Sequence, residues 1–183
     1  QEGVLVRNAE ALEKLEKIDT LVFDKTGTLT EGKPKLVTIL AAKDFSEVDL
    51  LTYAASVEKS SEHPIARAIL EGSRERNIQN LPDSENFKAS VGGGVVGVVH
   101  SKRVIVGTEK FLRLEGVRMS ESELEKFDEI RARGETTVFV AVDGVFAGSL
   151  GVTDPIKESA IDILNELKES GIRLVMLTGD HPA

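Results

Sequence analysis

Two apolar runs in this chain each end in a short loop of small polar residues, and this repeated pattern limits the fold most strongly. The run Thr20–Phe23 leads into the loop Asp24–Thr30, and the run Ile172–Leu177 leads into Thr178–Asp180. Short, continuously apolar runs are typical of buried strands in parallel sheets, and ligands bind at the carboxyl ends of such strands. The pattern therefore predicts an open α/β sheet with a ligand crevice beside both loops.

A helix is predicted immediately before the second run. Pro155 stands where a helix would begin, and Gly171 would end it. Apolar residues follow Pro155 at helical spacing: Ile156, Ala160, Ile163, Leu164 and Leu167. A further short amphipathic helix is expected over residues 7–18.

The middle of the chain has a different pattern. Helices are expected over 48–57, 64–76 and 120–134, the first and last opened by capping boxes at Ser46 and Ser120. Strands are expected over 95–100, 104–107, 138–142 and 145–152, and Asp143-Gly144 is a strong hairpin signal. Because hairpins imply antiparallel pairing, we expect an α+β domain of residues 36–148, inserted into an α/β domain made of residues 1–35 and 149–183.

Composition excludes several classes of function. Among 183 residues, 23 are basic and 31 acidic, giving a net charge of −8, and only 4% are aromatic. This balance argues against a nucleic-acid surface. No cysteine is present, so a disulfide scaffold, a zinc finger and a thiol nucleophile are excluded. No apolar run is long enough to span a membrane.

Asp24 is the main candidate for chemistry. A carboxylate at the end of a buried strand can attack phosphorus, and it can also hold Mg²⁺. Lys25 and the N–H groups of the loop would balance phosphoryl charge. The alternative is structural, since an aspartate in this position often only caps its own loop.

The complete loop Asp24-Lys25-Thr26-Gly27-Thr28-Leu29-Thr30 resembles the phosphorylation motif of P-type ATPases, which belong to the haloacid-dehalogenase-like superfamily. Asp154-Pro155-x-Lys157 resembles the next motif of that family, and Thr178-Gly179-Asp180 resembles its phosphate-contacting loop. The motifs occur in the expected order, and the resemblance covers essentially the whole chain. It implies a Rossmann-like phosphorylation domain interrupted by a nucleotide-binding domain.

The resemblance also implies roles for these residues. Asp24 would take the γ-phosphate of ATP as an aspartyl phosphate, and Thr178 would hydrogen-bond the transferred group within the loop it forms with Gly179 and Asp180. The Asp24 carboxylate and the Thr26 carbonyl oxygen would be the ligands of Mg²⁺. Phosphatases of the superfamily usually have a second aspartate at the position of Thr26, where it acts as general acid and base. A threonine cannot do this, so the intermediate should persist.

The inserted domain carries the marks of one subfamily. Ser61-Glu62-His63-Pro64 is similar to a signature of heavy-metal-transporting P-type ATPases. There His63 would lie against adenine, and Glu58 would accept a hydrogen bond from its amino group. The alternative for His63 is an ordinary helix cap.

The remaining predicted nucleotide contacts are glycines and one threonine. Gly92 and Gly94 match the nucleotide-binding Gly-x-Gly of the subfamily, where absent side chains would let a ligand approach the backbone. Gly107 is followed by Thr108, where the family often has asparagine that helps to hold the nucleotide. After Asp180 the chain continues with His181, where heavy-metal pumps usually have asparagine.

Together these features predict the cytoplasmic ATP-binding and phosphorylation part of a heavy-metal-exporting P-type ATPase in the cell membrane. Copper is the first expectation for the exported ion, with zinc, cadmium and cobalt open. The pump's membrane and actuator domains would be partners outside this chain, and two later motifs are absent before Ala183, so poor self-phosphorylation is expected. Two alternatives stay open: a soluble phosphatase of the superfamily, and a nucleotide-binding module with an inactive nucleophile.

Overall fold

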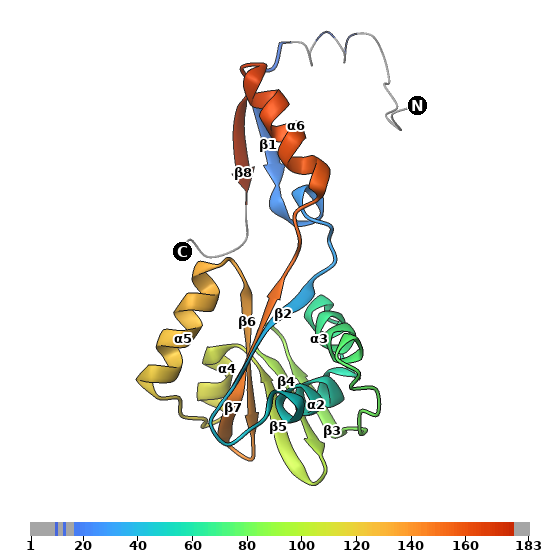
Figure 1. Cartoon of the computed structure of the whole chain (residues 1–183), viewed down its shortest axis with the longest axis vertical. Helices are drawn as coiled ribbons and strands as arrows, with labels where there is room; N and C mark the ends of the chain where they lie inside the picture. The colour runs from blue at the N-terminus through green and yellow to red at the C-terminus, as the bar shows by residue number, and fades with distance from the viewer. Residues whose placement is uncertain (1–9, 11–12, 14–16, 178–183) are drawn as a thin grey trace. The chain divides into compact units, whose positions relative to one another are not determined.

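The computed structural model describes residues 10, 13 and 17–177. The described residues form two compact units, which we treat separately (Figure 1). One contains the residues up to Gly32 and those from Ile156 onward, and the other is Lys33–Pro155. Most of the helix expected over 7–18 lies outside the described residues.

The first unit contains a parallel pair of strands, as the two apolar runs predict. β1 (Thr20–Asp24) pairs with β8 (Arg173–Leu177), with Asp24 opposite Leu177, and the helix α6 (Glu158–Glu169) precedes β8. Two segments far apart in the sequence therefore share one sheet (Figure 1). Parallel pairing of this kind requires a long crossover, and here the crossover contains the whole second unit.

Two expectations for the first unit are wrong in detail. The helix begins at Glu158 rather than at Pro155, because Ile156 makes an antiparallel bridge with Thr30 before the chain turns into the helix. β1 is not buried as its apolar run predicts, because Val22 is 54% exposed. At β8, Leu177 is 59% exposed, as expected for a strand that lacks a neighbour on one side. Within the described residues each of these strands has one neighbour, and a two-stranded sheet leaves most of its apolar surface uncovered.

The second unit is built on a six-stranded antiparallel sheet. Its strand order is β2-β7-β6-β5-β4-β3, and the strands are β2 (Lys35–Ala41), β3 (Glu85–Ser90), β4 (Gly94–Val99), β5 (Lys102–Gly107), β6 (Thr136–Val142) and β7 (Val145–Thr153). Its helices are α2 (Glu47–Glu58), α3 (Pro64–Glu75), α4 (Glu109–Leu114) and α5 (Glu121–Ala132). The antiparallel α+β domain expected in this part of the chain is therefore confirmed.

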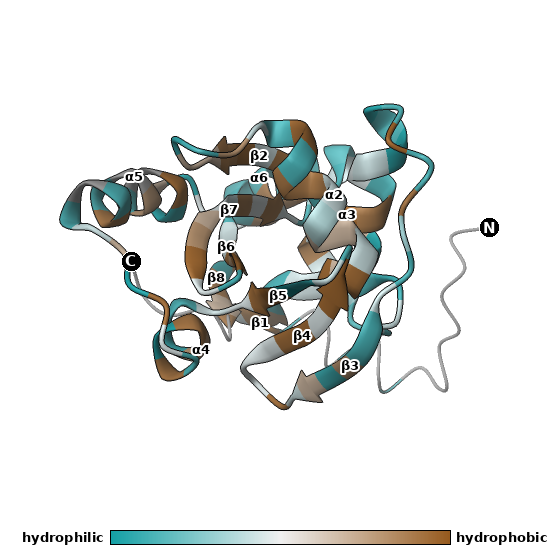
Figure 2. Ribbon diagram, turned by 90° about the horizontal axis from the view of Figure 1, so that it is seen from below, coloured by the Kyte–Doolittle hydropathy of each residue, from teal (hydrophilic) through white to brown (hydrophobic). Residues whose placement is uncertain are grey.

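Both faces of this sheet are covered by helices, so the unit has two hydrophobic cores. Along β6, Val138 and Val140 belong to the core under α2 and α3, whereas Phe139 belongs to the core under α4 and α5. Side chains alternate between the faces of a strand, which is why one strand supplies both cores. Figure 2 shows the hydrophobic residues along the strands and on the helices of this unit.

Local signals in the sequence predicted several elements well. The Ser46 hydroxyl accepts a hydrogen bond from the Asp49 N–H at 3.0 Å, which caps α2. At α5 the Glu123 carboxylate accepts from the Ser120 N–H at 2.7 Å, the second half of a capping box. Asp143 and Gly144 have φ of 50° and 79°, as a tight hairpin between β6 and β7 requires.

The strands β2 and β3 and the short helix α4 are not predicted from the sequence. β3 is an edge strand with mostly exposed residues, so it lacks the apolar alternation that reveals a strand. The compact unit runs from Lys33 to Pro155, slightly beyond the expected 36–148, because β2 and β7 pair as far as Lys35 and Thr153.

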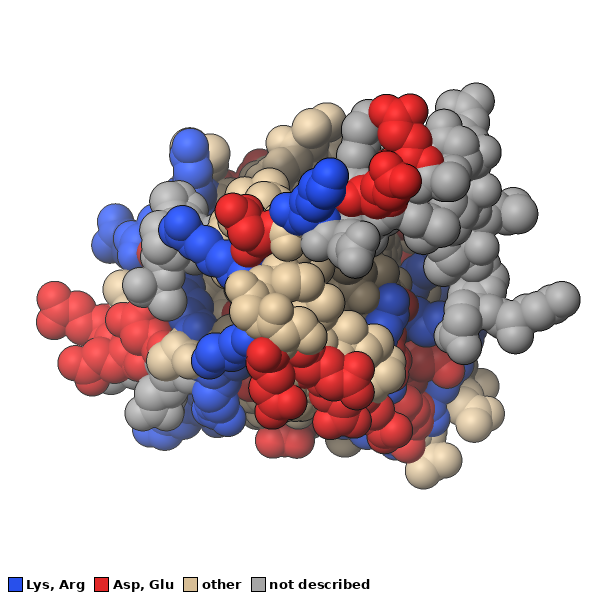
Figure 3. All heavy atoms as spheres, turned by 90° about the horizontal axis from the view of Figure 1, so that it is seen from above, with Lys and Arg blue, Asp and Glu red and all other residues tan. Residues whose placement is uncertain are grey.

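The face shown in Figure 3 carries acidic and basic side chains close to one another. Among the described residues, no helix combines the length and the apolar character that crossing a membrane requires.

Candidate functional site

Asp24 lies at the carboxyl end of β1, and its side chain is exposed. A wide turn over Lys25–Leu29 follows it, closed by a hydrogen bond from the Thr30 N–H to the Lys25 carbonyl oxygen at 3.2 Å. Gly27 has φ of 76° in this turn, a conformation that glycine adopts without steric cost. We call residues 25–30 the β1 loop.

The β1 loop is held from inside and from outside. Thr30 is 1% exposed, and its hydroxyl accepts from the Gly27 N–H at 2.9 Å and donates to the Lys25 carbonyl at 3.3 Å. From outside, the Lys157 ammonium donates to the carbonyls of Gly27 at 3.2 Å and Thr28 at 2.9 Å. The predicted phosphate-contacting residues Thr178, Gly179 and Asp180 lie outside the described residues.

The donor atoms beside Asp24 suit Mg²⁺ chemically. This cation prefers oxygen ligands and usually keeps one or two carboxylates together with waters and substrate phosphates. The Asp24 carboxylate and the Thr26 carbonyl oxygen are ligands of that kind, and both residues are exposed. No group of three or more acidic, histidine or cysteine side chains able to hold a metal occurs within the described residues.

All six residues predicted to contact a nucleotide line one cleft of about 540 Å³ in the second unit. They are Glu58, His63, Gly92, Gly94, Gly107 and Thr108. The cleft lies where α2 ends, α3 begins, and the strands β4, β5 and β6 have their ends. Its volume is in the ordinary range for sites that hold small organic ligands.

Glu58 is the most unusual side chain in this cleft. It is only 6% exposed, and its Oε2 atom has no hydrogen-bond partner among the described residues. Burial raises the pKa of its carboxyl group from 4.5 to about 7, although a hydrogen bond with Ser61 opposes this shift. Since buried polar atoms are nearly always paired, an orphaned carboxylate oxygen in a cleft indicates a ligand that donates a hydrogen bond.

His63 is a helix cap and a cleft residue at the same time. Its Nδ1 atom accepts a hydrogen bond from the Ile65 N–H at 3.2 Å at the start of α3. The neutral ring then carries its hydrogen on Nε2, which is available to donate. The structural alternative for His63 is therefore correct for one nitrogen, and it leaves the ring itself exposed beside the cleft.

The floor of the cleft is apolar. Val95, Val106 and Val138 come from the adjacent strands β4, β5 and β6 and belong to the same core face, and Ile65 adds an apolar contact from α3. Apolar residues around a few fixed polar groups are the usual surroundings of a planar ring in a binding site.

The glycines of the cleft differ in what surrounds them. A Cβ atom on Gly94 would collide with the Val106 carbonyl and with Gly107, so close β4–β5 packing requires glycine at this position. Gly107 is crowded in the same way by Gly93 and Gly94. Gly92 differs, because it has φ of 68° and open space where a side chain would be. Packing therefore does not explain Gly92, and its predicted role of admitting a ligand to the backbone stays a prediction.

Thr108 also has a structural task. Its hydroxyl accepts from the Phe111 N–H at 3.2 Å and caps α4. Sequence reasoning missed other lining residues, notably Ser61 and the β6 residues Thr136 and Thr137. Ser61 belongs to the motif that contains His63. Nothing in the local sequence marks Thr136 and Thr137, because they reach the cleft only through the strand order of the sheet.

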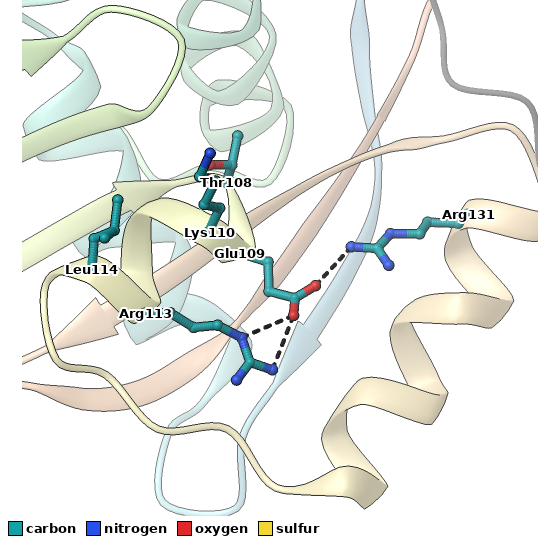
Figure 4. Close-up of a pocket in the computed structure, with 6 residues that line it drawn as sticks. All are labelled: Thr108, Glu109, Lys110, Arg113, Leu114 and Arg131. Carbon is teal, nitrogen blue, oxygen red and sulfur yellow. Dashed lines mark hydrogen bonds and ion pairs between the residues drawn. The ribbon is translucent and has the colours of Figure 1, made fainter.

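A second pocket shares Thr108 with the cleft and lies between α4 and α5 (Figure 4). There the Glu109 carboxylate accepts hydrogen bonds from Arg113 and Arg131, each at 3.0 Å. Burial alone would raise the pKa of Glu109, but the hydrogen bonds from Arg131 and Arg113 outweigh it and lower the pKa. Both arginines are already paired, so the interaction ties the two helices together and is not itself an anion site.

A haloacid dehalogenase-like hydrolase family model matches residues 18–183. The chain belongs to this family. It is 47% identical over 180 residues to a copper-exporting P-type ATPase of Legionella pneumophila, with 98% of this chain and 24% of the relative covered. The chain spans about a quarter of the length of the curated relatives it matches.

Two solved structures are similar over nearly the whole chain. A zinc-transporting PIB-type ATPase in an E2.Pi state has a TM-score of 0.77 at 33% identity, with 94% of this chain and 27% of that chain covered. The catalytic domain of the CPx-ATPase CopB-B, described for its conformational changes on nucleotide binding, has a TM-score of 0.70 at 29% identity, covering 97% and 59%. The chain therefore has the fold of the part of these ATPases that it matches.

Proposed function

We propose that this chain is the cytoplasmic ATP-binding and phosphorylation part of a heavy-metal-exporting P-type ATPase of the cell membrane. The observation that carries the proposal is the buried, unpaired Oε2 of Glu58 in a cleft of about 540 Å³. The exocyclic amino group of adenine supplies the hydrogen bond that this oxygen lacks. The apolar floor of valines receives the flat face of the base, and the His63 Nε2–H is a second donor.

In the proposed reaction, a carboxylate oxygen of Asp24 attacks the γ-phosphorus of ATP. The bond between that phosphorus and the bridging oxygen breaks, ADP leaves, and an aspartyl phosphate remains. Lys25 and the N–H groups of the β1 loop balance the charge on the transferring group, together with Thr178, Gly179 and Asp180. Bound Mg²⁺, held by the Asp24 carboxylate and the Thr26 carbonyl oxygen, would neutralise charge on the phosphates.

The exported ion and the partners of the chain are part of the same proposal. The named relatives support a transition-metal ion, copper in one case and zinc in the other. We take copper first, because the copper exporter has the higher sequence identity. Ligands that select the ion would lie in membrane-spanning helices, outside this chain.

Isothermal titration calorimetry of the chain with ATP tests the adenine site. Glu58→Ala should weaken binding about 10- to 100-fold, the loss expected when a hydrogen bond to a charged group is removed from a buried site. His63→Ala should weaken it less. Glu62→Ala is the matched control, because Glu62 is exposed, lies between Glu58 and His63 in the sequence and is absent from the residues that line the cleft. Equal affinity of wild type and Glu58→Ala would remove the adenine assignment.

A separate experiment tests Asp24. Radiolabelled MgATP should leave a weak acid-stable, hydroxylamine-labile label on the wild-type protein, because poor self-phosphorylation is expected, and none on Asp24→Asn. If the label appears on both proteins, or if neither takes it up while ATP still binds, then the chain is a nucleotide-binding module with an inactive nucleophile.

A further inference from the structure

Lys157 has a position that the stability of its own helix does not explain. It is the N-cap residue of α6, and its side chain makes no capping hydrogen bond. Serine, threonine, aspartate and asparagine are preferred at that position, and a cation there faces the positive end of the helix dipole. The side chain is half-buried and reaches back to the β1 loop instead.

The contacts between Lys157 and the β1 loop join segments about 130 residues apart in the sequence. The ammonium donates to the carbonyl oxygens of Gly27 at 3.2 Å and Thr28 at 2.9 Å. The Lys157 backbone N–H also donates to the Leu29 carbonyl at 2.8 Å. Three successive carbonyl groups of the loop therefore bond to one residue.

We propose that Lys157 is a positioning residue for the chemistry of Asp24. It acts by fixing the orientation of the peptide groups of the β1 loop, which follows Asp24 in the sequence. In a planar trans peptide, the C=O of one residue and the N–H of the next point in opposite directions. Holding the carbonyls of Gly27 and Thr28 therefore directs the N–H groups of Thr28 and Leu29 away from Lys157. Donors fixed in advance stabilise developing charge without reorganising during the reaction.

We call the hydrogen bonds from Lys157 to the carbonyls of Gly27, Thr28 and Leu29 the Lys157 clamp. The inference rests on the proposed function of Asp24, but the clamp is a structural claim that can be tested alone. Amide hydrogen exchange of Gly27 and Thr30 reports the order of the loop, because both amides are bonded within it. In Lys157→Met these two amides should exchange at least about tenfold faster, since the charge-assisted bonds are lost. Lys157→Arg should restore part of the protection.

Controls distinguish the clamp from a general loss of structure. Lys168→Met removes an exposed lysine near the other end of α6 and should leave exchange unchanged. Amides of the second unit serve as an internal reference for folding. Unchanged exchange at Gly27 and Thr30 in Lys157→Met would overturn the clamp.

The effect on reaction has its own signature. With MgATP, Lys157→Met should form the aspartyl phosphate about 10- to 100-fold more slowly, as misplacement of catalytic groups does. Its affinity for ATP should equal that of the wild type, because the cleft lies in the other unit. Slower phosphorylation with weaker ATP binding would contradict a positioning role. A wild-type protein that binds ATP but forms no aspartyl phosphate would instead contradict the proposed function of Asp24. Whether the clamp exists is decided by the amide hydrogen exchange of Gly27 and Thr30 alone.

Discussion

At the scale of single residues, the environment of Glu58 is explained by ligand binding better than by stability. It is buried with an unpaired oxygen, and such an arrangement costs stability unless a ligand completes it. The family resemblance identifies both Glu58 and His63 from the sequence. It does not reveal the burial of Glu58, because burial depends on how α2 packs on the sheet.

The raised pKa of Glu58 predicts how stability depends on pH. The native state keeps the proton up to about pH 7, whereas the unfolded chain loses it near 4.5. The contribution of Glu58 to the free energy of unfolding is therefore fully present below pH 4.5 and is lost as the pH rises through 7. The loss amounts to about 3 kcal/mol.

Glu58→Gln does not titrate, so its free energy of unfolding should rise relative to wild type by about this amount between pH 4.5 and 8. Urea denaturation of both proteins across that range measures the difference. A difference that stays constant with pH would show that the carboxyl group is not buried as described.

Thr26 gives a second prediction at this scale. It is exposed in the β1 loop and has an extended backbone conformation, φ −77° and ψ 123°, that aspartate also adopts. Thr26→Asp would supply a general base, so hydrolysis of the aspartyl phosphate should accelerate about 10²- to 10⁴-fold. A chase of labelled protein with unlabelled ATP measures the lifetime, with Thr26→Asn as the control that cannot take a proton. Equal lifetimes for the two variants would contradict the role assigned to this position.

At the scale of elements, glycines allow β4 and β5 to approach each other closely beside the cleft. Gly94→Ala forces a Cβ atom against the Val106 carbonyl and Gly107, and backbone cannot move away cheaply. The free energy of unfolding should fall by about 2 kcal/mol, a typical cost of overpacking. Gly92→Ala meets open space and should cost only the strain of its positive φ, about 1 kcal/mol.

Denaturation of both variants checks this order, with Gly116→Ala as a control that shares the positive φ and open space of Gly92. Gly92→Ala destabilising more than Gly94→Ala would contradict the packing explanation.

Elements with strong local signals could be predicted from the sequence, and those defined by distant pairing could not. The capped helices α2 and α5 and the Asp143-Gly144 hairpin follow from side chains within a few residues. β3 could not be found, because an exposed edge strand is stabilised by its pairing with β4 rather than by its own apolar pattern. For the same reason Thr136 carries no local signal, although it lines the cleft. Lys157 belongs to the motif Asp154-Pro155-x-Lys157, but the sequence does not reveal its hydrogen bonds to the β1 loop.

At the scale of the whole molecule, the two strands of the parallel pair, β1 and β8, are separated in the sequence by a complete antiparallel unit. The two units divide the proposed work, since one presents Asp24 and the other presents the nucleotide cleft. The division explains why substitutions at Glu58 and at Lys157 are expected to affect different steps. The exposed apolar side chains of β1 and β8, such as Val22 and Leu177, lie in the unit that carries Asp24.

The central claim is that the cleft lined by Glu58 and the Gly92–Gly94 turn binds the nucleotide. Amide chemical-shift mapping of the whole chain during titration with ADP tests it most directly. We predict shifts concentrated at Glu58–Ile65, Ala89–Val95 and Thr136–Val138, with saturation at one ADP per chain. Shifts centred instead on Arg113 and Arg131 in the pocket between α4 and α5, or no saturable shifts in the cleft, would contradict the account.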